Sequence, residues 1–113
     1  MIDIGEKVHI IERRLFDGDV RRHFFGEVER VENAAMRVTG YAFLYDAGST
    51  KYVRSANRRT RIIPLASSGF ILNVAPAGTQ VEKVRYEENS EGRLTVTDGG
   101  SFSLDINEFS RLR

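Results

Sequence analysis

FFGEVERVENAAMRVTGYAFLY, residues 24–45, holds two runs in which apolar side chains recur at nearly every second position. This period predicts two β-strands, because successive side chains of a strand point to opposite faces of a sheet. The polar Asn33 separates the runs and marks the turn between them. Val28 and Val31 are three positions apart, a step that a straight strand cannot keep on one face, so we expect a bulge or sharp bend there. The two strands are expected to form the spine of a small barrel.

A helix over residues 27–37 is the alternative interpretation, because Glu, Arg, Ala and Met are good helix formers. The flanking aromatic and β-branched residues favour strands instead. We therefore expect strands over residues 22–32 and 36–45, with Gly40 as a kink where the sheet curls.

Shorter runs on both sides of this stretch predict further strands. Asp17-Gly18-Asp19 precedes it and is a strong hairpin signal, because Gly supplies the positive φ that tight turns require. The strands expected in the first part of the chain cover residues 7–16, 22–32, 36–45, 51–56 and 60–65. Five strands joined by short turns predict an all-β fold, a small, strongly bent, five-stranded SH3-like barrel over residues 1–66.

Residues 67–113 predict a β-rich C-terminal extension. Short strand-like runs at 70–74, 81–87, 93–97 and 102–106 alternate with segments rich in Gly, Pro, Asn and Asp, which favour turns. We expect a C-terminal β-hairpin extension that packs on the barrel, so that residues 1–66 and 67–113 form a single structural unit.

Length and composition limit the class of protein. A chain of 113 residues with 41% apolar content can bury one modest core. The absence of Cys excludes disulfides and thiol chemistry. No apolar run is long enough to span a membrane, and the start MIDIGEKVHII lacks the features of a signal peptide. We therefore expect a cytoplasmic protein with no membrane partner.

One segment of the chain, residues 47–66, is basic and contains no acidic residue; we call it the basic island, and its cationic residues are Lys51, Arg54, Arg58, Arg59 and Arg61. Guanidinium groups combine charge, a fork of donors and a flat stacking face, which suits a nucleic-acid strand. A solvated strand end and turn is the alternative. Nearby aromatic residues can stack on bases or belong to the core or a subunit interface: Tyr41, Tyr45 and Tyr52.

Catalytic patterns are missing from the sequence. His9 and His23 have no partner at a metal-ligand spacing, so a structural role is favoured for both. Paired-carboxylate chemistry is conceivable, but the strand pattern favours a solvated face for Glu27, Glu29, Glu32, Glu87 and Glu88. Because no nucleophile, base and orienting group can be named together, we expect neither an enzyme nor a bound cofactor or metal.

Two segments of the chain resemble the motifs of the Sm/Lsm/Hfq family of RNA-associated proteins. Asp17-Gly18 followed by Gly26-Glu27-Val28-Glu29-Arg30-Val31-Glu32 resembles the first Sm motif. Val53-Arg54-Ser55 and Arg61-Ile62-Ile63-Pro64 resemble the second. The resemblance covers residues 5–66 and implies an Sm-like barrel, with SH3-like and OB-like barrels as neighbouring possibilities.

Family members commonly hold a base with an Asn after the second strand, a stacking side chain and the Arg of the second motif. By resemblance, Arg54 matches that Arg, Met36 falls where the Asn is usual, and Asn33 is displaced by three positions. Glu32 and Ser55 also depart from the family pattern. The RNA-binding residues that the resemblance and the basic island together predict are Arg54, Asn57, Arg58, Arg59, Arg61, Asn33, Met36 and Tyr41.

The resemblance implies a single-stranded RNA partner and a homo-oligomeric ring built by pairing of edge strands. The alternative function is a structural or protein-interaction subunit, a ring or adaptor component that binds no nucleic acid. Met36 in place of the usual Asn and the acidic extension favour that alternative. The extension is also a candidate cap for the edge that family members use to assemble.

Overall fold

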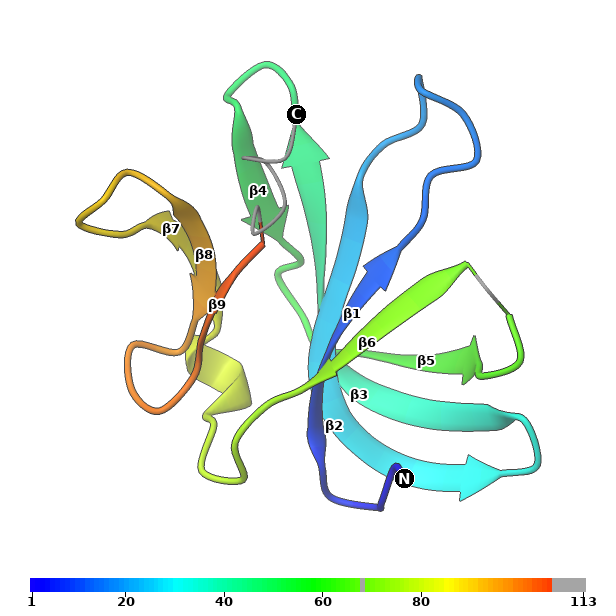
Figure 1. Cartoon of the computed structure of the whole chain (residues 1–113). Helices are drawn as coiled ribbons and strands as arrows, with labels where there is room; N and C mark the ends of the chain where they lie inside the picture. Colours follow the sequence, from blue (N-terminus) through cyan, green and yellow to red (C-terminus); the bar gives the residue numbers. More distant parts are fainter. Residues whose placement is uncertain (68, 107–113) are drawn as a thin grey trace.

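The computed structural model describes residues 1–67 and 69–106, and the part of the chain that it describes is almost entirely β-structure (Figure 1). The all-β prediction is confirmed. The elements, in chain order, are β1 (Lys7–Glu12), β2 (Arg22–Glu32), β3 (Ala35–Asp46), β4 (Lys51–Arg54), β5 (Arg59–Pro64), β6 (Phe70–Val74), the 3₁₀ helix η1 (Val81–Lys83), β7 (Arg85–Glu88), β8 (Leu94–Thr97) and β9 (Ser103–Asp105).

The larger sheet is antiparallel and has the strand order β4-β3-β2-β1-β6. Strand β3 serves two partners on the side away from β2: its first half, from Ala35 to Gly40, pairs with β5, and its last four residues pair with β4. The register between β2 and β3 shifts between Val28 and Arg30, which confirms the predicted bulge. In the described part of the chain, β5 pairs only with β3 and β6 only with β1.

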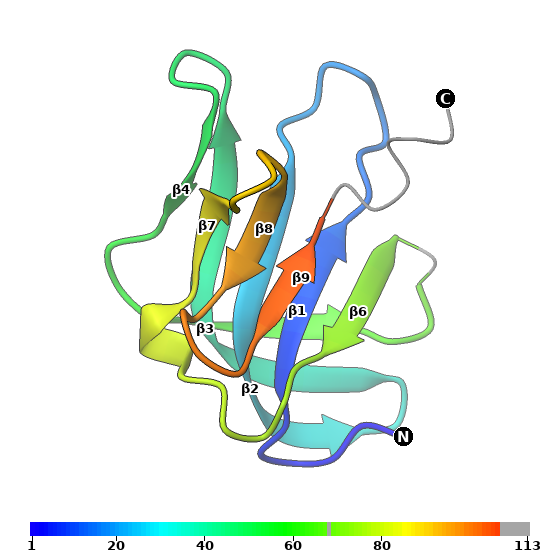
Figure 2. The same cartoon turned by 60° about the vertical axis from the view of Figure 1, so that its left-hand side comes forward.

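The smaller sheet has the order β7-β8-β9 and lies across one face of the larger sheet (Figure 2). The predicted C-terminal hairpin has two strands, whereas the observed sheet has three. Phe70–Val74, expected in the extension, pairs instead with β1 and becomes the sixth strand of the larger sheet. The expected strand over residues 81–87 begins as helix η1, because Val84 N–H bonds back to the Val81 carbonyl, and only its second part pairs as β7.

The first strand is shorter than predicted and ends at Glu12. The loop that follows folds on Asp19, whose carboxylate accepts hydrogen bonds from the backbone N–H groups of Leu15 and Phe16. Arg14 donates to the carbonyl of Asp17 in the same loop. These local bonds satisfy the backbone groups that a longer strand would have paired.

Strands β1, β2 and β3 are buried on both faces. Neighbouring residues of β2 enter different cores, Phe24 the inner core under β5 and β6, and Phe25 the outer core under the smaller sheet. The inner core contains Val8, Ile10, Phe24, Val28, Met36, Val38, Ala42 and Ile63, and the outer core contains Phe25, Phe43, Ala75, Val81, Val84, Val96 and Phe102. The alternation of each strand therefore decides which of two cores every side chain fills.

Gly26 and Gly40 lie opposite each other where β2 and β3 bend. A Cβ atom at Gly40 would collide with the backbone oxygen of Phe25 and with the Cα of Gly26. The predicted role of Gly40 at the curl of the sheet therefore has a steric basis, the close approach of two backbones.

Gly40→Ala is expected to destabilise the fold by about 1–3 kcal/mol, because the added methyl group must push the two strands apart. Urea denaturation followed by circular dichroism measures the change. Gly18→Ala is the matched control, since a Cβ there meets no atom within 4 Å. Equal stability of the two variants would contradict the proposed steric role of Gly40.

Candidate nucleic-acid interface

Among the described residues, β5 covers one end of the inner face of the larger sheet and leaves the other end open. Val53, Leu44 and Arg22 lie opposite one another on β4, β3 and β2, and the row continues through Glu12 on β1 to Phe70 on β6. The neighbouring row, which includes Ala42, Phe24 and Ile10, is buried. Because β5 pairs with the other half of β3, it leaves Leu44 41% and Val53 53% exposed.

A cavity of about 170 Å³ lies on this uncovered end, and we call it the arginine groove; its lining residues are Arg22, Ala42, Leu44, Val53, Arg54, Ser55, Arg59 and Arg61. None of these residues is Asp or Glu. Arg22 lies 4.0 Å from a carboxylate oxygen of Glu12, and Arg54 donates to the backbone carbonyl of Glu82. Within residues 1–67 and 69–106, neither Arg59 nor Arg61 forms an ion pair.

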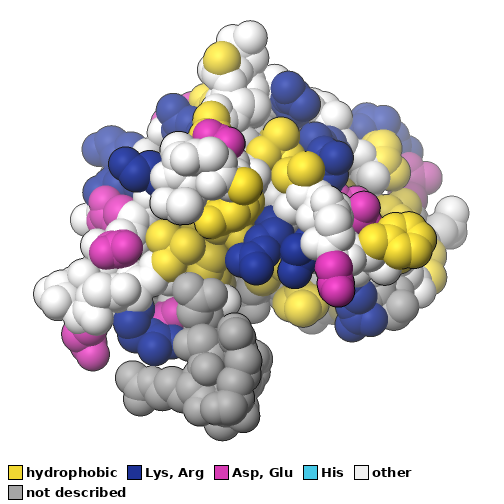
Figure 3. Space-filling view, turned by 90° about the horizontal axis from the view of Figure 1, so that it is seen from above, with side chains coloured by type: hydrophobic (Ala, Val, Ile, Leu, Met, Phe, Trp, Pro, Cys, Tyr) yellow, Lys and Arg dark blue, Asp and Glu magenta, His cyan; other side chains and the backbone are white. Residues whose placement is uncertain are grey.

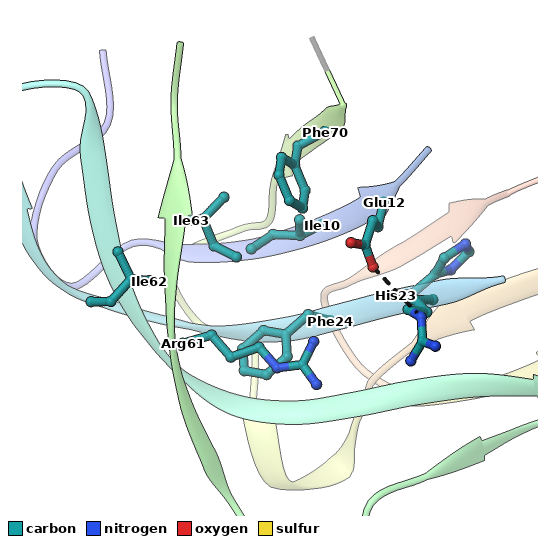
Figure 4. A pocket seen from close by; sticks show the side chains of 9 residues that line it. Ile10, Glu12, His23, Phe24, Arg61, Ile62, Ile63 and Phe70 are labelled. Atoms are coloured by element: carbon teal, nitrogen blue, oxygen red, sulfur yellow. Dashed lines mark ion pairs between the residues drawn. The ribbon is translucent and has the colours of Figure 1, made fainter. Parts of the chain in front are cut away.

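A second cavity, of about 240 Å³, adjoins the arginine groove and shares Arg22 and Arg61 with it; we call it the seam cavity, because it lies between β5 and β6. Its interior is formed by Ile10, Phe24, Ile63 and Phe70. Figure 4 shows Ile10, Ile63 and Phe70 pointing toward one another from three different strands. Groove and cavity together make a surface that is cationic at its rim and apolar inside.

The end of the molecule that carries the β3–β4 turn combines charged and hydrophobic side chains on its surface. Lys and Arg side chains lie beside hydrophobic side chains on this face, with several Asp and Glu side chains among them (Figure 3). The loop between β1 and β2 adds exposed apolar residues, among them Leu15 and Phe16. Mixed cationic and apolar character of this kind suits a ligand with both negative charge and flat rings.

The expected residues Arg54, Arg58 and Tyr41 come together on the opposite face of the sheet. The guanidinium carbons of Arg54 and Arg58 lie 4.5 and 5.6 Å from the centroid of the Tyr41 ring. Glu82 of helix η1 forms an ion pair with Arg58 and accepts a hydrogen bond from the Tyr41 hydroxyl. An acidic residue of the C-terminal part thus compensates charge from the basic island here.

The remaining expected residues lie in three further places. Arg59 and Arg61 line the arginine groove, and Asn57 lies in the β4–β5 connection, where its carbonyl accepts from Ser55. Asn33 and Met36 lie at the β2–β3 turn, at the lower end in Figure 1, far from β4. Met36 is 1% exposed and belongs to the inner core. The structure therefore separates Asn33 and Met36 from the arginines.

His9 and His23 form a buried cluster with Tyr86 between the two sheets. The Tyr86 hydroxyl lies 2.7 Å from Nε2 of His9 and 2.5 Å from Nδ1 of His23, and the Tyr86 ring stacks on Tyr52 with centroids 4.4 Å apart. Burial lowers the pKa of His9 to about 3, with a further contribution from His23. Burial, assisted by Arg21, lowers the pKa of His23 to about 4. Both imidazoles are therefore neutral at pH 7.

Acidification is expected to destabilise the fold through these two residues. In the unfolded chain a His binds a proton near its ordinary pKa of about 6.5, whereas His9 and His23 stay neutral in the folded state down to about pH 3 and 4. The unfolded state therefore binds more protons below pH 6.5. The free energy of unfolding decreases as the pH is lowered, by up to about 1.4 kcal/mol per pH unit for each His.

Urea denaturation between pH 7 and pH 4.5 measures this slope, and His9→Gln should reduce it, because the variant has lost one of the two titrating groups. The carboxylates contribute equally to both proteins and cancel in the comparison. An identical slope in the variant would exclude His9 as a source of the pH dependence.

No family model, curated protein or solved structure matches this chain. The Sm-like resemblance and the RNA partner remain predictions. Within the described residues, no helix is long and apolar enough to cross a membrane.

Two features of the site were not predicted from the sequence. Glu82 is separated from Arg58 by 24 residues, and no local pattern connects them. The position of Arg22 could have been predicted, because it is two residues before the buried Phe24 and so lies on the same face of β2. The arginine groove could have been found by following that face across the sheet.

Proposed function

We propose that this chain is a cytoplasmic, non-enzymatic RNA-binding module that holds a single strand along the arginine groove. The observation that carries the proposal is the groove lining, which holds Arg22, Arg59 and Arg61 and, among the described residues, no carboxylate. Neutralisation of phosphates by Arg, with release of counterions, supplies most of the affinity in such complexes. The Sm-like resemblance favours RNA over DNA.

The floor of the groove supports a single strand in preference to a duplex. Leu44, Val53 and Ala42 form an apolar surface between the guanidinium groups. Unpaired bases can cover such a surface while their phosphates reach the arginines, whereas a duplex presents its sugar–phosphate backbone. The groove therefore fits a strand whose bases are free.

The double variant Arg59→Ala/Arg61→Ala is expected to weaken binding of a labelled 15-nucleotide single-stranded RNA by at least about tenfold at 0.1 M salt. Loss of two phosphate contacts should also lower the slope of log K against log salt by about 1.4, or 0.7 for each contact. Fluorescence anisotropy over a salt series measures both quantities, and single-stranded DNA of the same sequence tests the preference for RNA.

Arg30→Ala/Arg85→Ala is the control for total charge, because Arg30 and Arg85 are exposed and paired with Glu32 and Glu87. A loss equal to that of the groove variant would argue against a localised site. A second comparison uses neighbours in the chain: Arg59→Ala should weaken binding more than Arg58→Ala, since Glu82 already pairs with Arg58. The reverse order would assign RNA to the Tyr41 face instead.

We also propose that copies of the chain associate through the free edge of β5, as a ring or as an adaptor subunit. In the described part of the chain β5 pairs only with β3, and its residue Ile62 is 59% exposed. An unpaired edge with an exposed apolar residue favours strand addition by another copy.

Light scattering on a sizing column is expected to give the mass of several subunits for the wild-type protein and a lower mass for Ile62→Lys, because a charge on an edge opposes pairing. Leu15→Lys is the control, because it adds an equal charge on an exposed apolar residue of the β1–β2 loop, away from the strand edges. A monomeric wild-type protein would exclude association through this edge and leave the RNA-binding proposal unaffected.

A further inference from the structure

The seam cavity opens at the surface of the molecule and has an apolar inner wall. Ile10, Phe24 and Ile63 in its wall are 2%, 2% and 5% exposed. It exists because β5 and β6, in the described part of the chain, do not pair with each other across the inner face. The cavity has a volume of about 240 Å³, and its inner wall of Ile10, Phe24 and Ile63 offers water few hydrogen-bond partners, so this part is suited to an apolar guest.

The mouth of the seam cavity carries two cations, Arg22 and Arg61, and one carboxylate, Glu12. The guanidinium carbon of Arg61 lies 5.3 Å from the centroid of the Phe24 ring, so the side chain extends over that ring at the entrance (Figure 4). Phe70 faces the same space from β6. A guanidinium stacked on one ring can take a second flat ring on its opposite face.

Arg22 and Arg61 connect the seam cavity to the arginine groove, because both residues line both spaces. These two arginines can therefore bind a negatively charged group that adjoins a ligand in the cavity. Glu12 at the mouth pairs with Arg22 and leaves Arg61 as the cation without a carboxylate among the described residues. The complementary ligand combines a flat ring system with an adjoining anionic group.

We propose that the seam cavity receives one unstacked nucleobase of a strand whose phosphates lie in the arginine groove. This inference rests on the proposed function and deepens it, because it adds a base-binding site to a phosphate-binding surface. The base lies between Arg61 and Phe70, with Ile10 and Ile63 against its edges. A strand that binds through its sugar–phosphate backbone alone would leave this site empty. The affinity for a strand should therefore depend on whether it carries bases.

The test compares two labelled 15-nucleotide probes of equal charge, a single-stranded RNA and a strand in which every base is replaced by an abasic ribose. The wild-type protein is expected to bind the RNA about tenfold more tightly, as stacking of one base on an aromatic side chain provides. Phe70→Ala is expected to lower this preference to about threefold or less, and the remainder comes from bases that cover the apolar floor of the arginine groove. The salt dependence should stay unchanged, because the arginines are intact.

Ile71→Ala is the matched control, since Ile71 is the neighbouring residue of β6, is 51% exposed and lies outside the cavity lining. It should keep the tenfold preference for RNA. If circular dichroism shows that Phe70→Ala does not fold, Phe70→Leu takes its place, because it removes the ring and keeps the apolar contact with the inner core.

The outcomes separate the two proposals. Equal, salt-dependent binding of both probes by the wild-type protein would overturn the base site and leave the RNA-binding function standing. An undiminished tenfold preference for RNA in the folded Phe70 variant would also overturn the base site. Absence of salt-dependent binding to either probe would overturn the proposed function together with this inference.

Discussion

Burial of strand β2 on both faces constrains the whole structure. Phe24 and Phe25 are adjacent in sequence, yet one fills the inner core and the other the outer core. Each such side chain contributes about 1.5–3 kcal/mol on burial, and a slip of one residue in register would exchange their faces and disrupt both cores at once. The register of β2 is therefore held from two sides, which fixes the neighbouring strands as well.

The same alternation positions the polar residues at the start of β2. Arg22 follows the parity of Phe24 and lies at the arginine groove, whereas His23 follows the parity of Phe25 and joins the cluster with Tyr86. Core packing thus places a cation on one face and a neutral imidazole on the other. The two faces also differ in how their arginines are paired: Glu82 pairs with Arg58 on the outer face, whereas on the inner face Glu12 reaches Arg22 and, among the described residues, no carboxylate pairs with Arg59 or Arg61.

Local patterns in the sequence predicted most strands, because period 2 and turn residues act over a few positions. Strands β2 and β6 have the predicted bounds, and the bulge after Val28 is where the spacing placed it. Strand β1 ends early because Asp19 binds the amides that would have continued it. The candidate site was less accessible to prediction, since its geometry depends on pairs distant in sequence, such as Arg58 with Glu82. The prediction that Asn33 binds RNA came from the family resemblance. In the structure, Asn33 lies at one end of β3 and β4 pairs with the other end.

The bridge made by Tyr86 has a consequence for proton positions. Its single hydroxyl hydrogen can be given to only one of two imidazole nitrogens, so the other ring must donate to the hydroxyl oxygen. Among the described residues, the buried Nδ1 of His9 has no hydrogen-bond partner, and a buried N–H left unbonded is less tolerable than a bare lone pair. His9 therefore carries its hydrogen on Nε2 and donates to Tyr86, which donates to His23. Three side chains from β1, β7 and β2 thus form a hydrogen-bond relay with one direction, and the tautomer of each imidazole is set by a residue of the opposite sheet.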